Sequence, residues 1–209
     1  MSKNFELYLA KYYEWMQARG WSERTLDSYF SDVKFFIDYL VKETSVQNLP
    51  DIDGKVLSGF QTFLFNYQTK SGKRLALSSQ HNRLVSVRSF FRFLFETDVL
   101  LFDPSVVINL PRKRKHLPKG VMNEQQVNKL LEQPDSNTDL GLRDRAILET
   151  LYSTGIRNSE LRSLNVYDVD FNQLQINVIK GKNAKDRMVP LGEIAADYIK
   201  EYLLTVRPK

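Results

Sequence analysis

The chain has 209 residues, of which 42% are apolar and 26% charged, and a formal net charge of +5 at pH 7. This length and apolar content suit a folded chain of one large or two small domains and exclude disorder. The absence of cysteine excludes a disulfide framework, cysteine-ligated zinc and a thiol nucleophile, and two histidines are too few for a histidine-rich metal site.

The first part of the chain predicts three helices one after another. Apolar residues recur at helical spacing over residues 5–16, and Gly20 ends that segment. Ser22 is the N-cap candidate of a second helix, whose apolar stripe covers residues 26–40. Asp53 is the corresponding cap candidate of a third helix.

A fourth helix is expected to begin at Ser78 or Ser79. Its apolar residues fall on one predicted buried face: Leu84, Val87, Phe91, Leu94 and Phe95. Arg83, Arg88 and Arg92 lie off this stripe. We therefore expect one side of the helix to pack in a core and the other to present cations.

A proline-bounded, strongly basic segment follows at residues 111–118, and it is typical of an extended linker. We expect a helical domain at residues 1–102, a basic linker at 103–120 and a second domain at 121–209. No apolar run reaches membrane-spanning length and the first residues lack a signal peptide's apolar core, so we expect a cytoplasmic protein.

The second domain mixes helices with a hairpin. Asn123 and Gln126 form a capping-box pattern at the start of its first helix, and Gly155 ends a second helix that begins near residue 140. A short helix is expected at 159–164, a β-hairpin from strands at 174–179 and 187–190, and a last helix at 192–206.

The positive charge is concentrated in two stretches. Residues 54–95 hold seven lysines and arginines and no acidic residue, and residues 104–123 hold five more, again without an acid. Long acid-free basic stretches favour a surface that faces a polyanion, nucleic acid above all. The alternative is a solvated charged face.

One pattern of residues in the second domain carries chemistry. Arg157 follows directly after a helix end, where its guanidinium can grip a phosphate through two oxygens, and Glu160 lies one helical turn later. Lys182 lies at the predicted hairpin tip, where it can reach a phosphate or give up a proton. Taken singly, these are also an ordinary i, i+3 ion pair and a solvated turn lysine.

The order and wording of these motifs resemble the tyrosine recombinase family, which includes phage integrases and Xer-type resolvases. Residues 154–161 match the family's Thr-Gly-Leu-Arg-x-Ser-Glu-Leu pattern with Ile156 in place of leucine, and residues 181–191 match its Gly-Lys-Gly-x-Lys-x-Arg-x-Val-Pro-Leu hairpin with Asn183 in place of glycine. Residues 143–149 and 82–94 also match, so that the resemblance covers nearly the whole chain.

The resemblance implies strand exchange through a 3′-phosphotyrosyl link, without metal or nucleotide cofactor. Arg157 then matches the first catalytic arginine and Lys182 the hairpin lysine, with Lys185 as the alternative. Glu160 and Asp144 match supporting positions. These groups would place preorganised charge around a phosphoryl transfer.

The resemblance also implies the fold: a mainly α chain with a small β-hairpin, in which a four-helix, SAM-like core-binding domain precedes the N-terminal half of an α+β catalytic domain. The family's His-x-x-Arg motif and nucleophilic tyrosine lie beyond the position of Lys209. We therefore expect an incomplete chain that binds DNA and does not cleave it.

The expected partner is double-stranded DNA, clamped between the two domains, with phosphates contacted by the linker and base edges by the fourth helix. The candidate contacts are Arg83, Arg88, Arg92, Arg112, Lys113, Arg114, Lys115 and Lys185. Complete family members assemble as tetramers on DNA, and we expect this chain to be a monomer away from DNA. The alternatives are a natural truncation that occupies recombination sites without cutting, and an unrelated helical interaction module.

Overall fold

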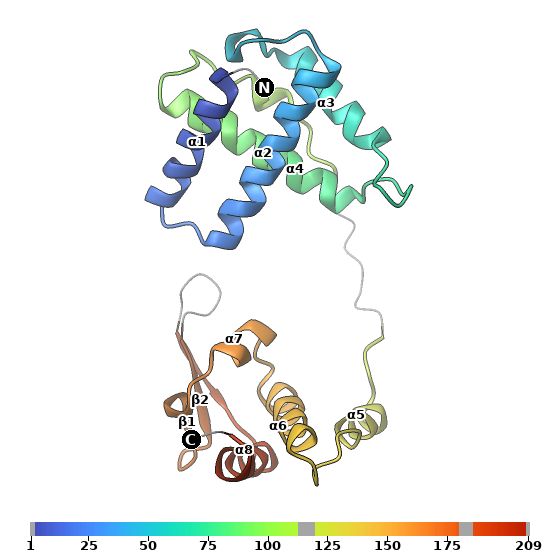
Figure 1. Ribbon diagram of the computed structural model, residues 1–209, viewed down its shortest axis with the longest axis vertical. Helices are drawn as coiled ribbons and strands as arrows, with labels where there is room; N and C mark the ends of the chain where they lie inside the picture. The colour runs from blue at the N-terminus through green and yellow to red at the C-terminus, as the bar shows by residue number, and fades with distance from the viewer. Residues whose placement is uncertain (1–2, 113–119, 180–185, 208–209) are drawn as a thin grey trace. The chain divides into compact units, whose positions relative to one another are not determined.

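The computed structural model describes residues 3–112, 120–179 and 186–207. The chain divides into two compact units, Met1–His116 and Leu117–Lys209, which we call the N-terminal and the C-terminal unit (Figure 1). In the described part of the chain, no helix combines the length and the apolar character that crossing a membrane requires.

In residues 3–112 of the N-terminal unit, the regular elements are all helices apart from one isolated bridge between Gln68 and Arg74. Ser22 and Asp53 cap the second and third helices as predicted, because their side chains accept backbone N–H groups of the first turn. The elements are α1 (Lys3–Ala18), α2 (Glu23–Glu43), η1 (Leu49–Asp51), α3 (Gly54–Asn66), α4 (Leu77–Glu96) and η2 (Pro104–Val107).

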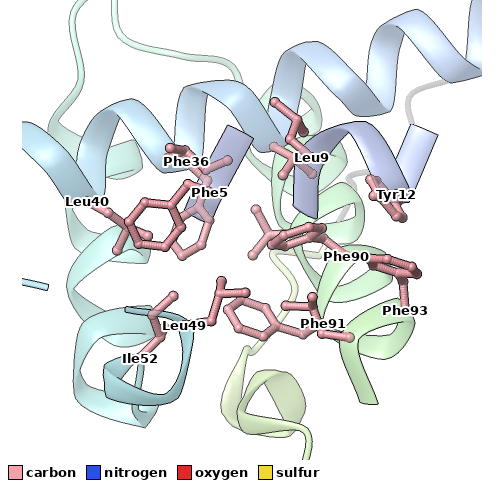
Figure 2. Packing of buried hydrophobic residues seen from close by; sticks show 14 of the residues in the cluster. Phe5, Leu9, Tyr12, Phe36, Leu40, Leu49, Ile52, Phe90, Phe91 and Phe93 are labelled. Carbon is pink, nitrogen blue, oxygen red and sulfur yellow. The ribbon is translucent and has the colours of Figure 1, made fainter. Parts of the chain in front are cut away.

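Aromatic side chains from all four helices contribute to the core of this unit. Figure 2 labels those of α1, α2 and α4. Tyr12 of α1 meets Phe90 of α4 edge-on, with ring centroids 5.3 Å apart, and Phe36 of α2 meets Phe60 of α3 at 4.8 Å. All four rings are fully buried. Burial of such side chains contributes about 1.5–3 kcal/mol each, so this core fixes which face of α4 points outward.

Four of the five residues of the predicted buried stripe of α4 are buried, namely Leu84, Val87, Phe91 and Leu94, but the buried face extends beyond that stripe. The helix begins at Leu77, one or two residues before the expected start, and its N-cap residue Ala76 makes no side-chain cap bond. Phe95 is 47% exposed, whereas Phe90 and Phe93 are buried. The buried arc is therefore rotated towards the side that carries Phe90 and Phe93, and Arg83, which lies three and four residues before the buried Ser86 and Val87, falls within it.

The C-terminal unit combines helices with a three-stranded antiparallel sheet of order β1-β2-β3. In the sheet Ile176 pairs with Val189, and Val178 pairs with Arg187. The elements are α5 (Glu124–Leu131), α6 (Asp139–Thr154), α7 (Asn158–Ser163), η3 (Val166–Asp168), β1 (Val169–Asp170), β2 (Gln175–Val178), β3 (Arg187–Pro190) and α8 (Glu193–Thr205). The predicted fold class is confirmed, and β1 is a strand that the pattern did not indicate.

The core of the C-terminal unit lies between the sheet and its helices. Ile156, just after α6, packs with Ile176 and Val178 of β2 and with the first turn of α8. Arg145 links α6 to α5. It forms an ion pair with Glu149 at 2.7 Å and donates a hydrogen bond to the Leu131 carbonyl of α5 at 2.6 Å. Because Ile156 packs against β2, the loop between α6 and α7 lies beside the sheet.

Candidate active site

The turn after α6 places the candidate catalytic arginine. Gly155 ends the helix in the left-handed conformation, with φ 61° and ψ 18°, and its N–H donates to the Leu151 carbonyl. An L side chain is disfavoured at such angles, which explains the glycine. Ile156 is buried immediately afterwards, and this anchor makes Arg157 the N-cap residue of α7.

Glu160 holds Arg157 through two contacts. The Arg157 backbone N–H donates to Glu160 Oε2 at 2.8 Å, which is the carboxylate half of a capping box. Arg157 Nη1 donates to Glu160 Oε1 at 2.7 Å. The predicted i, i+3 pair is present, and it fixes both ends of the arginine residue.

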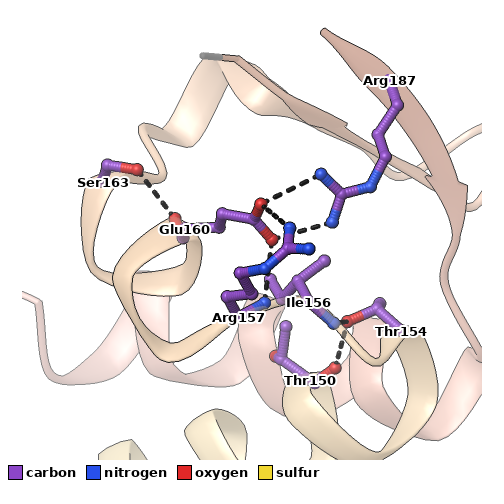
Figure 3. A network of polar contacts seen from close by, with 7 residues as sticks. All are labelled: Thr150, Thr154, Ile156, Arg157, Glu160, Ser163 and Arg187. Atoms are coloured by element: carbon purple, nitrogen blue, oxygen red, sulfur yellow. Dashed lines mark hydrogen bonds and ion pairs between the residues drawn. The ribbon is translucent and has the colours of Figure 1, made fainter. Parts of the chain in front are cut away.

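A second arginine reaches the same carboxylate from the sheet (Figure 3). Arg187, the first residue of β3, donates from Nη1 to Glu160 Oε1 at 3.0 Å and from Nη2 to Oε2 at 2.7 Å. The Glu160 side chain is 6% exposed, that of Arg187 37% and that of Arg157 54%. We call these three residues the Glu160 cluster.

The electrostatics of the Glu160 cluster keep its carboxylate ionised. The hydrogen bonds from Arg187, followed by the one from the Arg157 backbone, hold the pKa of Glu160 far below its ordinary value of 4.5. Glu160 in turn raises the pKa of Arg187. The cluster therefore carries one net positive charge, and its most exposed member is Arg157.

A half-exposed guanidinium with spare N–H donors and a fixed backbone suits the binding of an oxyanion. Planar paired donors match two oxygens of a phosphate or carboxylate. No group of three or more acidic or histidine side chains fit to hold a metal ion occurs in residues 3–112, 120–179 and 186–207. The Glu160 cluster thus has the exposed donors and the net positive charge that binding an anion requires.

Asp144 lies elsewhere on the surface of its unit. Its carboxylate is 50% exposed and accepts hydrogen bonds from the neighbouring Arg143 at 2.8 and 2.9 Å. Within the described residues it shares no hydrogen bond or ion pair with Arg157 or Glu160. The supporting role expected of Asp144 therefore rests on the resemblance alone.

Both candidate lysines, Lys182 and Lys185, lie outside the described residues, in the segment between β2 and β3. The paired residues nearest to this segment on each side are Val178 and Arg187. Arg187, which is part of the Glu160 cluster, therefore lies in the pair of residues nearest to this segment.

On the N-terminal unit, Arg88 and Arg92 are exposed on the outer side of α4, as predicted. They line an open hollow of about 470 Å³ together with Arg19, Trp15 and Trp21. The Arg19 guanidinium stacks 3.7 Å from the centre of the Trp15 ring. This hollow gathers three cations, two large aromatic rings and the carboxylates of Glu96 and Asp103.

Within the hollow, two arginines share one glutamate. Arg92 Nε donates to Glu96 Oε1 at 2.7 Å, and Arg19 Nη2 donates to Oε2 at 3.1 Å. The Arg92 side chain is 72% exposed and that of Glu96 31%. We call Arg19, Arg92 and Glu96 the Glu96 cluster.

The expected exposure of Arg83 is wrong. Its side chain is 23% exposed and its guanidinium lies 3.8 Å from the centre of the Phe35 ring. Arg83 Nε is 3.9 Å from Asp32 Oδ1, and within the described chain its buried Nη1 has no hydrogen-bond partner. The physical reason is the rotated buried arc of α4, which includes Arg83.

Of the linker cations, Arg112 is exposed, while Lys113, Arg114 and Lys115 lie outside the described residues. The chain just before the linker is held by two contacts: Gln61 Nε2 donates to the Asn109 carbonyl at 2.7 Å, and His81 Nδ1 lies 2.9 Å from the Pro111 carbonyl. The linker thus leaves the N-terminal unit from a fixed point beside α3 and α4.

The sequence patterns alone indicate no role for Arg187 or Arg19. Arg187 stands in the hairpin motif Lys-x-Arg-x-Val-Pro-Leu, which was a signal, but its partner Glu160 is 27 residues away. Arg19 is 77 residues from Glu96. Periodicity detects partners within one helix and not partners at such separations.

Two family models match the chain. The model of the phage integrase N-terminal SAM-like domain covers residues 9–97, and that of the phage integrase family covers residues 120–207. The chain belongs to the phage integrase family of tyrosine recombinases. The resemblance found in the sequence motifs is thereby confirmed.

The chain is similar to Xer recombinases along almost its whole length. It is 37% identical over 202 residues to tyrosine recombinase XerC 2 of Ralstonia nicotianae, a match that covers 97% of this chain and 58% of that protein. It is 36% identical over 204 residues to tyrosine recombinase XerD of Haemophilus influenzae, covering 97% and 64%. The chain thus spans between 58% and 64% of the length of these curated relatives.

Solved integrase structures share the fold. A Tn1549 transposon integrase in complex with a circular intermediate DNA matches with a TM-score of 0.65 at 14% identity, covering 96% of this chain and 66% of that one. A lambda integrase tetramer bound to a Holliday junction matches with a TM-score of 0.64 at 18% identity, covering 95% and 55%.

Proposed function

We propose that this chain binds duplex DNA and supplies part of the active site of a site-specific tyrosine recombinase. The observation that carries the proposal is the Glu160 cluster, in which Arg157, half exposed, is held by its backbone and its side chain against an ionised carboxylate. The family membership gives this anion site its substrate class, a scissile DNA phosphate.

In the proposed reaction a tyrosine oxygen attacks the phosphorus and forms the 3′-phosphotyrosyl bond as the bond to the 5′ oxygen breaks. Arg157 stabilises the charge that develops on the non-bridging oxygens. Lys182, or Lys185 in its place, gives the 5′ oxygen its proton, and Glu160 positions Arg157. The family resemblance also gives Asp144, which lies on α6, a supporting role at this site.

The DNA contacts come from two further regions under this proposal. Arg88 and Arg92 face outward from α4 and suit base edges or phosphates, while Arg112, Lys113, Arg114 and Lys115 neutralise phosphates along the linker. Lys185 would add a contact from the hairpin. Arg83 offers less, because its side chain is mostly enclosed by Phe35 and Asp32.

The neighbouring structures show other integrases on DNA, one of them as a tetramer on a Holliday junction. We propose that this chain is a monomer away from DNA and that recombination-competent assembly occurs on the DNA. A DNA substrate would place the protein in the cytoplasm.

The test is duplex binding as a function of salt. If the five cations between residues 104 and 123 each neutralise one phosphate, log Kd plotted against log salt should change with a slope of magnitude about 4 to 5. Absence of binding to any duplex at low salt would overturn the proposal, and so would binding that is indifferent to salt.

A charge-matched comparison assigns the contacts. Replacing Lys113, Arg114 and Lys115 by alanine should weaken binding equally on all sequences and reduce the salt slope by about three. Replacing three exposed lysines outside both basic stretches, Lys11, Lys34 and Lys42, removes the same charge and should change the slope little. Equal effects of the two triple variants would show that only net charge matters.

A further inference from the structure

The four hydrogen bonds to the Glu160 carboxylate are divided evenly between its oxygens. Oε1 accepts Arg157 Nη1 at 2.7 Å and Arg187 Nη1 at 3.0 Å. Oε2 accepts the Arg157 backbone N–H at 2.8 Å and Arg187 Nη2 at 2.7 Å. A carboxylate offers about four acceptor positions, so this one is saturated, and Arg187 uses half of them.

We propose that Arg187 is a positioning residue for Arg157: by occupying both oxygens of Glu160, it prevents the carboxylate from binding the Arg157 side chain bidentately and leaves that guanidinium available to a phosphate. This inference rests on the proposed function, because it assigns Arg157 the phosphate. It gives the first residue of β3 a role in the site.

The geometry explains why a third group is needed. An arginine next to a 6% exposed carboxylate forms the two-bond, fork-to-fork pair when both oxygens are open to it. Arg157 makes only one such bond, because Arg187 already forms the fork-to-fork pair from the opposite side. A phosphate then has to replace one side-chain hydrogen bond of Arg157 and not two.

The charges point the same way. Glu160 with Arg157 alone is a neutral pair, which attracts a phosphate weakly. Arg187 restores one net positive charge while its own guanidinium is engaged by Glu160. The net positive charge of the Glu160 cluster is thus available to a phosphate on Arg157, whose side chain is 54% exposed.

The proposal predicts how fast phenylglyoxal, a reagent for accessible guanidinium groups, modifies Arg157 in the 209-residue chain without DNA, as measured by mass spectrometry of the peptide. Arg187→Ala should slow the modification of Arg157 roughly tenfold, since Glu160 then binds it with one more charged hydrogen bond. Arg162, exposed on the same short helix, is the internal standard within each sample.

The double variant separates positioning from simple structural support. Glutamine at position 160 keeps an oxygen for the Arg157 N–H but no longer holds the guanidinium as an anion. Glu160→Gln in the Arg187→Ala background should therefore return the modification rate of Arg157 to the wild-type value or above. If Arg187 only stabilised the fold, Arg187→Ala would loosen α7, and the modification of Arg157 would become faster in the single variant and faster still in the double variant.

Two controls complete the test. Arg143→Ala removes an arginine from the exposed Asp144 pair and should leave Arg157 unchanged. Arg187→Lys keeps the charge without the fork and should give an intermediate rate, which tests the proposal even if Arg187→Ala does not fold. An unchanged or faster rate at Arg157 in Arg187→Lys, relative to Arg162, overturns the proposal.

The proposed function is tested separately in the same samples. Duplex DNA should protect Arg157 of the wild-type chain from phenylglyoxal if that residue meets a phosphate. Binding without protection contradicts the phosphate role of Arg157 but leaves the competition between Arg157 and Arg187 for Glu160 intact. Protection combined with indifference to Arg187 contradicts only the further inference.

Discussion

The two units each contain one glutamate shared by two arginines, and the two clusters differ in burial. In the Glu96 cluster the carboxylate is 31% exposed and one partner, Arg92, lies one turn away on the same helix. In the Glu160 cluster the carboxylate is 6% exposed and one partner, Arg187, comes from a strand 27 residues later. The same three charges thus form a solvated pair of contacts in one unit and an enclosed network in the other.

The difference determines what each cluster can do. Exposed ion pairs are screened by water and salt and contribute about 0–1 kcal/mol, so the arginines at Glu96 can exchange it for a DNA phosphate at small cost. The enclosed carboxylate at Glu160 cannot be left without partners, because an unpaired buried charge is strongly destabilising. The arginines of the Glu96 cluster are held by a solvated carboxylate, and Arg157 is held by an enclosed one.

The largest expected effect is the loss of thermal stability when the Glu160 carboxylate is removed, in contrast to removal of the Glu96 carboxylate. Glu160→Ala should lower the thermal midpoint of the C-terminal unit by several degrees, because Arg187 loses its partner and α7 loses its capping contact at the Arg157 N–H. Glu96→Ala should leave the midpoint of the N-terminal unit almost unchanged. Calorimetry or circular dichroism melts check both, and equal shifts would break the distinction drawn from burial.

Low pH should reduce the stabilisation that the Glu160 carboxylate provides. Because the pKa of Glu160 is lower in the folded chain than its ordinary value of 4.5, the unfolded chain binds more protons, and stability rises with pH. The contribution of Glu160 is complete above pH 4.5 and is lost as the pH falls below that value. Melts of the wild type and Glu160→Gln should therefore converge in acid, and a constant difference from pH 7 to pH 3 would contradict the assignment.

Local chemistry explains which features were predictable from the sequence. The caps at Ser22, Asp53 and Asn123 and the strand at residues 187–190 agree with their patterns, because each depends on neighbours within a few residues. The pairing of Arg157 with Glu160 follows from the same rule.

Tertiary packing explains what was not predictable. The apolar pattern of α4 is compatible with two neighbouring buried arcs, and the helices that pack on it select the arc that encloses Arg83 and exposes Phe95. Arg187 meets Glu160 only because the sheet brings β3 beside α7. No periodicity within a helix or strand encodes either result.

A comparison of two arginines on α4 tests whether an exposed arginine contributes to DNA binding and an enclosed one to stability. Arg88→Ala removes an exposed cation, so it should weaken duplex binding several-fold and reduce the salt slope by about one without changing stability. Arg83→Ala removes the stack on Phe35 and the cation beside Asp32, whose pKa burial already raises. It should therefore lower the stability of the N-terminal unit by about 1 kcal/mol.

The measurements are duplex titrations at several salt concentrations and urea unfolding of both variants. Arg92→Ala should behave like Arg88→Ala, with weaker binding at unchanged stability, since Arg92 is exposed on the same helix and its ion pair with Glu96 is solvated. If Arg83→Ala affected DNA binding as strongly as Arg88→Ala at unchanged stability, the enclosed position of Arg83 would be the wrong explanation of its role.

The smallest expected effect has the opposite sign and is the sharpest test of the comparison. Glu96→Gln removes the acid that engages Arg19 and Arg92, so it should strengthen duplex binding by roughly twofold to threefold at low salt, the range of an exposed ion pair. Gln17→Glu is the control with the opposite change of charge. It adds an exposed acid on α1 and should weaken duplex binding modestly. If Glu96→Gln weakened binding instead, Glu96 would organise its arginines as Glu160 does, and burial would not be what separates the two clusters.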